Sequence, residues 1–323
     1  MKHSGFFNNF VCCSTTALLV SLIPTMAHTQ DLAPTNAPAP DQQTFASPDD
    51  AVIALRTAVE SDNEPALDKL FGPEIQSLRT GDKVQDARNA RRFAMAMAVN
   101  CQLDKENPNR IFIEVGTNDW PMPVPLVQAN GQWFFDTPAG KEEAIDRHIG
   151  KDELAAIGVC RAYVAAQRKF AAMNGGVYAE KFKSSDDKRD GLYWPSAENE
   201  PTSAFGRLVA EADAEGYNGG TGPQPFHGYF FKILTRQGPA APGGKMNYMS
   251  GGSLKNGFAL VAWPQHWDQS GIMSFVVNQD GNVYQTNFGE KTTRIASKIK
   301  EYNPDNQWQL VQDEGIPNII LEK

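Results

Sequence analysis

Three closely spaced strand-like segments near the C-terminus constrain the fold more than any other part of the chain. The run from Phe258 to Trp263 is apolar without alternation, which is typical of a central strand covered on both faces. Pro264 cannot donate to a ladder and is expected to end this strand. Two further strands follow and meet at Asp280-Gly281. The block therefore predicts an antiparallel sheet, and it contains no recognisable catalytic group.

The Asp280-Gly281 pair favours a two-residue type I′ turn, in which both central residues have positive φ. Such a turn pairs Val277 with Tyr284 and Phe275 with Thr286. Because side chains alternate across a strand, this register predicts one buried face that consists of Met273, Phe275, Val277 and Tyr284.

The N-terminus has the composition of an export signal. Lys2 and His3 precede the apolar segment 16–23, which is too short for a membrane span of about 20 residues. Thr25-Met-Ala27 is a suitable cleavage site, so we expect a signal peptide over 1–27 and no membrane span after cleavage. The Pro- and Ala-rich segment 28–44 is expected to be a flexible linker. This organisation predicts a periplasmic or secreted protein.

Composition is that of a globular protein with about two domains. The chain has 323 residues, of which 41% are hydrophobic and 21% charged. A formal net charge of −8 argues against a nucleic-acid partner, because phosphate binding needs a concentrated basic surface. We expect an α+β fold with domains at 45–150 and 151–323.

The first domain is predicted to combine helices with a curved antiparallel sheet. Ser47 and Pro48 suit the N-cap and first position of a helix. Helices are expected over 51–59, 64–70 and 86–99, and strands over 111–115, 124–128 and 132–136. Asn130-Gly131 is a strong signal for a hairpin between the last two strands. This order resembles the cone-shaped nuclear-transport-factor-like fold.

The second domain is predicted to be a long helix followed by a meandering sheet. Apolar residues at helical spacing predict a helix from Lys151 to Met173. A loop-rich region over 184–226 should contain one helix near 203–214. The sheet should begin at 227–234, and the extension 292–323 should add a helix and an edge segment.

Several motifs in order resemble the secreted bacterial family called domain of unknown function 2950. They are residues 119–126 (Asp-Trp-Pro-Met-Pro-Val-Pro-Leu), 131–136, 139–143, 189–195 (Arg-Asp-Gly-Leu-Tyr-Trp-Pro), 233–238 and 241–244. The resemblance covers nearly all of the mature chain. It implies an exported protein of the Gram-negative envelope and carries no established activity.

The C-terminal half also resembles the globular domain of type IV pilins and pseudopilins. The similarity lies in the helix block 157–171, the following loop 177–179, and strands at 228–230, 257–259 and 275–281. The chain departs from pilins because it lacks the prepilin segment and has a domain before the helix. An assembly role is one expectation, whereas polymerisation into a pilus is not implied.

Motifs for catalysis or metal binding are weak. His227 and His266, with Asp190 or Asp268, would form a base or metal site only if their strands were neighbours, and structural histidines are commoner. Asn278, Asp280 and Asn282 have calcium-loop spacing, but Val283 stands where such a loop needs Gly. The glycine-rich segments 219–222 and 243–245 are in no phosphate-loop context. We therefore predict no catalytic residue, metal or cofactor, and we lean against an enzyme.

Aromatic residues near Pro or Gly are the best candidates for a binding surface. Aromatics on shaped loops suit contact with an envelope protein, a peptide or a glycan. The competing interpretation is that they seal the junction between the domains. The candidate binding residues are Trp120, Tyr193, Trp194, His227, Tyr229, Trp263 and Trp267. The rival function is an enzyme or small-ligand carrier with a pocket in the N-terminal domain.

Two cysteines remain after signal cleavage, Cys101 and Cys160. In an oxidising compartment such a pair either forms a disulfide or persists as two buried thiols, and the sequence favours neither.

Overall fold

A computed structural model describes residues 37–312 except 81, 187, 196–202, 207, 210–211 and 213–223. The predicted signal peptide, most of the linker and the segment 219–222 lie outside these residues. The fold is α+β, as expected, and residues from Pro34 onward belong to one compact unit. The N-terminal elements are α1 (Pro48–Glu60), α2 (Glu64–Phe71), the 3-10 helix η1 (Pro73–Leu78), α3 (Lys83–Val99), β1 (Cys101–Asn107), β2 (Arg110–Val115), β3 (Trp120–Pro121), β4 (Leu126–Ala129) and β5 (Gln132–Phe135).

The first helix starts where its capping residues predict. The Ser47 side chain accepts a hydrogen bond from Asp50 N and donates to Asp50 Oδ2 at 2.7 Å. This exchange satisfies one of the free N–H groups of the first turn. The buried side of α1 presents Ala51 and Leu55 to the N-terminal core.

The N-terminal sheet is antiparallel, in the order β1-β2-β4-β5, with β3 paired to β2. The Asn130-Gly131 turn has φ values of 52° and 76° and joins β4 to β5 with Ala129 opposite Gln132. The pairing confirms the predicted hairpin, and positive φ at both central residues is typical of a type I′ turn. Strand β1 was not predicted, because five of its seven residues are polar or charged.

The long helix α4 (Thr137–Met173) begins 14 residues before the predicted Lys151. Asp136 caps it by accepting from Ala139 N at 3.3 Å, and Pro138 lies in its first turn. The prediction failed here because half of the residues in 137–150 are polar or charged and two are glycines, which weakens the apolar period. The domain boundary expected at 150/151 lies inside this continuous helix.

The remaining elements form the C-terminal region. They are β6 (Tyr229–Leu234), β7 (Arg236–Gln237), β8 (Met246–Asn247), β9 (Met249–Ser250), β10 (Ser253–Leu254), β11 (Ala259–Pro264), β12 (Ser274–Asn278), β13 (Val283–Thr286), η2 (Gly289–Lys291), α6 (Thr292–Ala296) and β14 (Gln309–Leu310). The helix and edge segment expected after residue 292 are present as α6 and β14. The helix expected near 203–214 lies partly outside the described residues, because 207, 210–211 and 213–214 are not among them.

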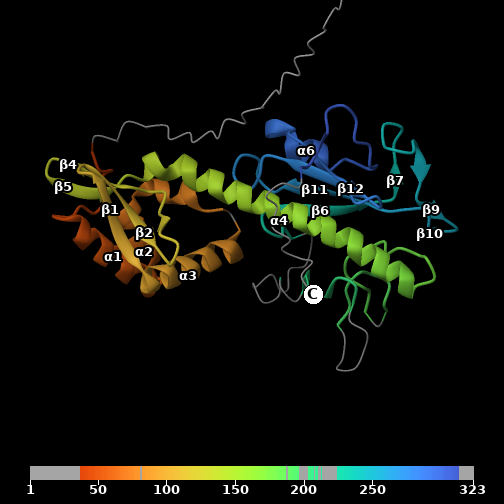
Figure 1. Cartoon of the computed structure of the whole chain (residues 1–323), viewed down its shortest axis with the longest axis horizontal. Coiled ribbons are helices and arrows are strands. Elements are labelled where there is room, and N and C mark those ends of the chain that lie inside the picture. Colours follow the sequence, from red (N-terminus) through yellow and green to blue (C-terminus); the bar gives the residue numbers. More distant parts are fainter. Residues whose placement is uncertain are drawn as a thin grey trace, which may run out of the picture. The chain divides into compact units, whose positions relative to one another are not determined.

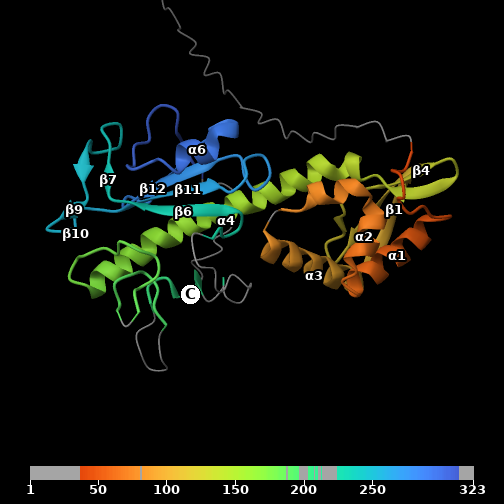
Figure 2. The same cartoon turned by 180° about the vertical axis from the view of Figure 1, so that it is seen from behind.

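The main C-terminal sheet has the order β14-β13-β12-β11-β6, and every residue of the central strand β11 is buried. Figures 1 and 2 show α4 along one face of this sheet and α6 on the other. Leu260 and Ala262 enter the core on the α4 side, whereas Val261 and Trp263 enter the core on the α6 side. The expected double coverage of β11 and its end at Pro264 are confirmed.

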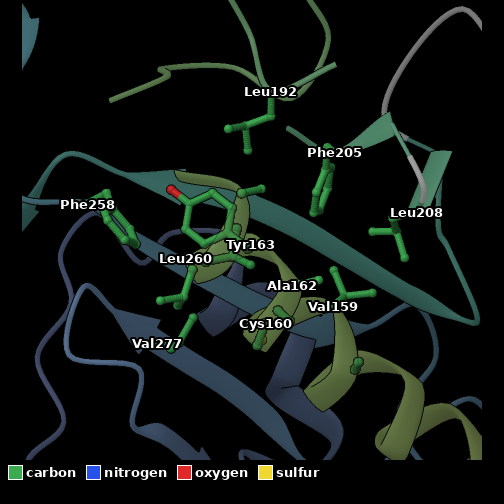
Figure 3. Close-up of a cluster of buried hydrophobic side chains, with 14 of the residues drawn as sticks. Val159, Cys160, Ala162, Tyr163, Leu192, Phe205, Leu208, Phe258, Leu260 and Val277 are labelled. Atoms are coloured by element: carbon green, nitrogen blue, oxygen red, sulfur yellow. The ribbon is translucent and has the colours of Figure 1, made fainter. Parts of the chain in front are cut away.

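The core beneath α4 contains side chains from the helix, from the C-terminal sheet and from the segment between them in the chain. In Figure 3, Val159, Ala162 and Tyr163 of α4 lie between strand residues Leu260 and Val277 and, on the opposite side, side chains from the segment 192–208. Tyr163 is fully buried, and its hydroxyl donates to Ala259 O at 3.2 Å. The helix therefore packs on two sides.

The β12–β13 hairpin has a different register from the predicted one. Val277 pairs with Val283 rather than Tyr284. The turn spans Asn278 to Gly281, with Gly281 N bonded to Asn278 O, and the Asn278 side chain accepts from Asp280 N at 3.1 Å. Only Gly281, at φ 88°, has positive φ within this turn. Asn278 thus forms an Asx turn, and the loop is longer than the predicted two residues. With this register Tyr284 packs against the core on the α6 side, and not on the face of Phe275 and Val277 as predicted.

Two glycines of α4 provide a matched test of how this helix is packed. A Cβ on Gly140 would lie 2.5 Å from Val124 Cα, whereas Gly150 has open space. We expect Gly140→Ala to destabilise the fold by about 2 kcal/mol or more, because the obstruction is backbone. Gly150→Ala should stabilise it by about 0.5–1 kcal/mol through helix propensity. Urea denaturation measures both, and equal effects would contradict the described packing.

Candidate functional site

Four of the seven predicted binding residues are buried. They are Trp194, His227, Tyr229 and Trp263. Tyr229 is fully enclosed, and its hydroxyl donates to Met273 O at 2.9 Å. Trp263 is the residue before the last in β11 and lies beside Phe230, with ring centroids 5.8 Å apart. These side chains pack within the C-terminal region and do not form an open aromatic surface.

The other three aromatic residues reach solvent at separate places. Trp120 is 43% exposed on β3, and the Arg147 guanidinium lies 5.1 Å from its ring centroid. Tyr193 is half-buried and pairs through its backbone with Phe182. Trp267 is half-buried in the loop that follows β11. Of the seven, only Trp267 lines one of the two main surface hollows among the described residues.

The hollow at Trp267 has a volume of about 320 Å³ and opens to solvent. Its lining residues are Gln265, His266, Trp267, Gln269, Glu290 and Thr293. Every one of these side chains can make hydrogen bonds, and Glu290 is the only acid or base among them apart from His266. The hollow is therefore mainly polar and weakly acidic, and the half-buried Trp267 is its one aromatic lining residue.

The loop that carries Trp267 is fixed by its own hydrogen bonds. Ser270 Oγ accepts from His266 N at 3.0 Å and donates to His266 O at 3.1 Å. Trp267 Nε1 donates to Asn287 Oδ1 at 3.0 Å, which sets the orientation of the indole ring. Asp268 has φ 65°, a left-handed conformation that Asp tolerates better than most residues. The hollow is thus formed before any ligand arrives.

Helix α4 anchors the far end of the same loop. Glu153 Oε1 accepts from Ile272 N and Met273 N, both at 2.9 Å. A side chain at Gly271 would collide with the Tyr229 hydroxyl. Tyr229 therefore has a positioning role, and the close approach explains why the loop needs glycine there.

The adjacent residue Asp152 is fully buried and faces different partners. Gln85 Nε2 of α3 donates to its Oδ1 at 2.6 Å, and His148 Nε2 lies 3.0 Å from its Oδ2. A Cβ on Gly228 would lie 2.7 Å from Oδ2, so the turn at 227–228 closes over the carboxylate. Burial raises the pKa of Asp152, opposed by hydrogen bonding and charge from His148 and by hydrogen bonding from Gln85.

His227 lies at this turn in a strained conformation, with φ 46°. Burial, followed by the positive charges of Arg88 and Lys151, lowers its pKa to about 4, so the imidazole is neutral at neutral pH. Strands β6 and β11 are neighbours, and Gln265 N donates to Gly228 O at 2.8 Å. Asp190, however, bonds Lys181 and Ser185. Within the described ranges no group of three or more His, Cys, Asp or Glu side chains is arranged to hold a metal.

A second hollow lies on the N-terminal region, between α1 and the edge strand β1. Its volume is about 520 Å³, and it is also open. It is lined by Asp49, Val52, Ile53, Arg56, Cys101, Gln102, Leu103 and Lys105. The interior behind it is filled by side chains such as Leu55 and Ile113.

Both remaining cysteines are free thiols. Cys101 is half-buried in the N-terminal region, and Cys160 is fully buried in the core beneath α4. Burial raises the pKa of Cys160 to about 12, which keeps it a thiol. Of the two alternatives that the sequence left open, a disulfide or two free thiols, the structure has two free thiols.

Comparison with known proteins gives one match. The family model described as "Protein of unknown function (DUF2950)" matches residues 42–311. No curated protein and no solved structure matches the chain. The pilin-like arrangement expected from the sequence is therefore not confirmed by a structural neighbour. Among the described helices, none combines the length and the apolar character that a membrane span requires.

Asp152 provides a pH-dependent test of the buried junction. Its pKa in the folded state lies above the ordinary value that it has in the unfolded chain. The fold therefore loses stability as the pH rises from the unfolded-state pKa to the folded-state pKa, and the loss persists at higher pH. Asp152→Asn keeps an acceptor for Gln85 and removes the charge. We expect a higher Tm than wild type at neutral pH and no advantage near pH 3, measured by scanning calorimetry.

Asp152→Ala is the contrasting variant at this position. It leaves Gln85 Nε2 without its acceptor and opens a void, which should cost about 2–3 kcal/mol. If Asp152→Asn were as unstable as Asp152→Ala at neutral pH, the proposed cost of the buried charge would be wrong.

Glu153 provides a local test of how the loop is anchored. We expect Glu153→Ala to speed amide exchange at Ile272 and Met273 by about tenfold or more, because both N–H groups lose a charged acceptor. Glu153→Gln keeps an oxygen acceptor and should change exchange much less. Hydrogen exchange followed by NMR measures both, and unchanged protection in Glu153→Ala would remove the anchoring role.

Proposed function

The chain belongs to the DUF2950 family, whose description assigns no activity, and we propose that it is an exported, non-enzymatic binding module of the bacterial envelope. Its contact site is the loop 264–271, with the hollow at Trp267. The observation that carries this proposal is that the hollow is held open and rigid by the chain's own hydrogen bonds. A preformed site loses little conformational entropy on binding.

Export is supported by the N-terminal sequence. Lys2, the apolar segment 16–23 and the small residue Ala27 have the order of a cleavable secretory signal. We propose a periplasmic or secreted location for the mature chain on this basis.

The position of the pair His227 and Asp152 argues against a role for these two residues in catalysis. His227 and Asp152 are both buried, and Gly228 closes over the carboxylate. A general base must reach its substrate within hydrogen-bonding distance. The Trp267 hollow instead offers a side-chain surface suited to contact.

A second candidate function is that of a small-ligand carrier at the N-terminal hollow. Its volume of about 520 Å³ lies within the range of small-molecule sites. Cys101 lines it, so a bound ligand would slow the reaction of this thiol with maleimide. Maleimide should therefore label Cys101 more slowly in the wild-type chain saturated with its ligand than in the free chain.

An assembly role is compatible with the same contact site. A long helix packed on an antiparallel sheet is the arrangement that the pilin-like resemblance implies. Such a role predicts that the chain co-purifies with secretion or pilus machinery.

Site-specific photocrosslinking in intact cells tests the contact site. A photoreactive residue at exposed Gln269 should capture a partner, whereas one at exposed Gln128 on β4 should not. Adding Trp267→Ala should reduce the Gln269 crosslink by about fivefold or more, because central aromatic residues dominate binding energy. Equal capture at both positions, or none at Gln269, would contradict the proposed site.

A further inference from the structure

The chemistry of the Trp267 hollow narrows the class of ligand it would accept. Its rim has two amides, an imidazole, a hydroxyl and one carboxylate, from Gln265, Gln269, His266, Thr293 and Glu290. These groups offer both donors and acceptors at short range. A complementary ligand must therefore carry several groups that can both donate and accept hydrogen bonds.

Two common ligand classes fit poorly. Phosphate-bearing ligands are recognised by Arg, Lys or clustered N–H donors, whereas the lining of this hollow contains neither Arg nor Lys. Purely apolar ligands prefer sites lined mainly by hydrophobic side chains. The single carboxylate also disfavours polyanions by like-charge repulsion.

A neutral saccharide meets each remaining requirement. Sugar hydroxyls donate and accept hydrogen bonds, which matches amide and carboxylate side chains. The C–H face of a pyranose ring carries a weak positive charge, and the face of an indole carries a negative one. Trp267 already has its ring orientation set by Asn287, which itself accepts a second bond from Gly289 N at 2.7 Å.

We propose that the Trp267 hollow binds a neutral saccharide segment of the cell envelope, with the sugar stacked on Trp267 and its hydroxyls bonded by Gln265, Gln269 and Glu290. This inference rests on the proposed function, because it names the ligand of the same site. The volume of about 320 Å³ suits a short segment of a chain rather than a large ligand.

Titration by NMR of the intact mature chain tests the ligand class without a variant. The six tryptophans give six indole N–H signals, and Trp267→Phe assigns that of Trp267. A neutral oligosaccharide of β-1,4-linked N-acetylglucosamine is the first probe and a neutral α-1,4-linked glucose oligosaccharide the second. We expect at least one of them to shift the Trp267 signal in a saturable way and to leave the Trp120 signal unchanged.

Variants then test the roles of individual residues. Trp267→Ala should weaken binding of that probe by about tenfold or more, while Trp120→Ala, which removes another solvent-exposed indole, should leave it unchanged. Glu290→Gln should let the site accept an anionic polyuronate that the wild-type chain rejects. Circular dichroism checks that each variant is folded.

The outcomes separate the ligand class from the binding function. If neither neutral probe shifts the Trp267 signal, or if Trp120→Ala weakens binding as much as Trp267→Ala, the saccharide proposal is wrong. If the Gln269 crosslink still captures a protein in that case, the binding function stands with a different ligand. If neither experiment gives a signal at this loop, both proposals fail.

Discussion

The burial of one uninterrupted helix is the constraint on which the rest of this structure depends. The first turns of α4 contact the N-terminal elements: Thr137 Oγ1 donates to Phe71 O at 2.7 Å, and Gly140 lies against the backbone of Val124. Its last turns bury Tyr163 and Phe170 in the core beneath the C-terminal sheet. One hydrogen-bonded rod therefore contacts the N-terminal elements at its start and supplies side chains to the core beneath the C-terminal sheet further along, and this packing stabilises the helix.

The middle of α4 organises the candidate site through two consecutive acids. Successive residues of a helix point about 100° apart, so neighbours in sequence face different partners. Asp152 bonds Gln85 of α3, whereas Glu153 bonds the backbone at Ile272 and Met273. The loop that carries Trp267 is thus held by the same turn of helix that holds α3. Its rigidity comes from this shared support as much as from its own hydrogen bonds.

Local features of the sequence predicted most of the fold, and non-local contacts explain what was missed. The capped start of α1, the Asn130-Gly131 hairpin and the doubly covered β11 each follow from a few adjacent residues. The β12–β13 register was wrong because the side chain of Asn278 outweighs the preference of Asp-Gly for a two-residue turn. Within the site, Trp267 was predicted, but Asp152 and Glu153 were not. His148 lies one helical turn from Asp152, but the partners that join these two acids to other elements, Gln85, Ile272 and Met273, lie 67 to 120 positions away in sequence.

Because α4 is continuous, the direction in which side chains point at one end of the helix is set relative to the other end. Deleting one residue near Gly150 would rotate everything beyond it by about 100° and shift it by about 1.5 Å along the axis. If Gly140 then kept its backbone neighbours, Tyr163 would turn out of its core. If Tyr163 stayed in its core, Gly140 would lose those neighbours. A substitution is tolerable at Gly150, where an added side chain meets open space, but a change in length is not. We therefore expect natural length variation in this family to fall in the surface loops and to spare the interval between Asp136 and Asn174.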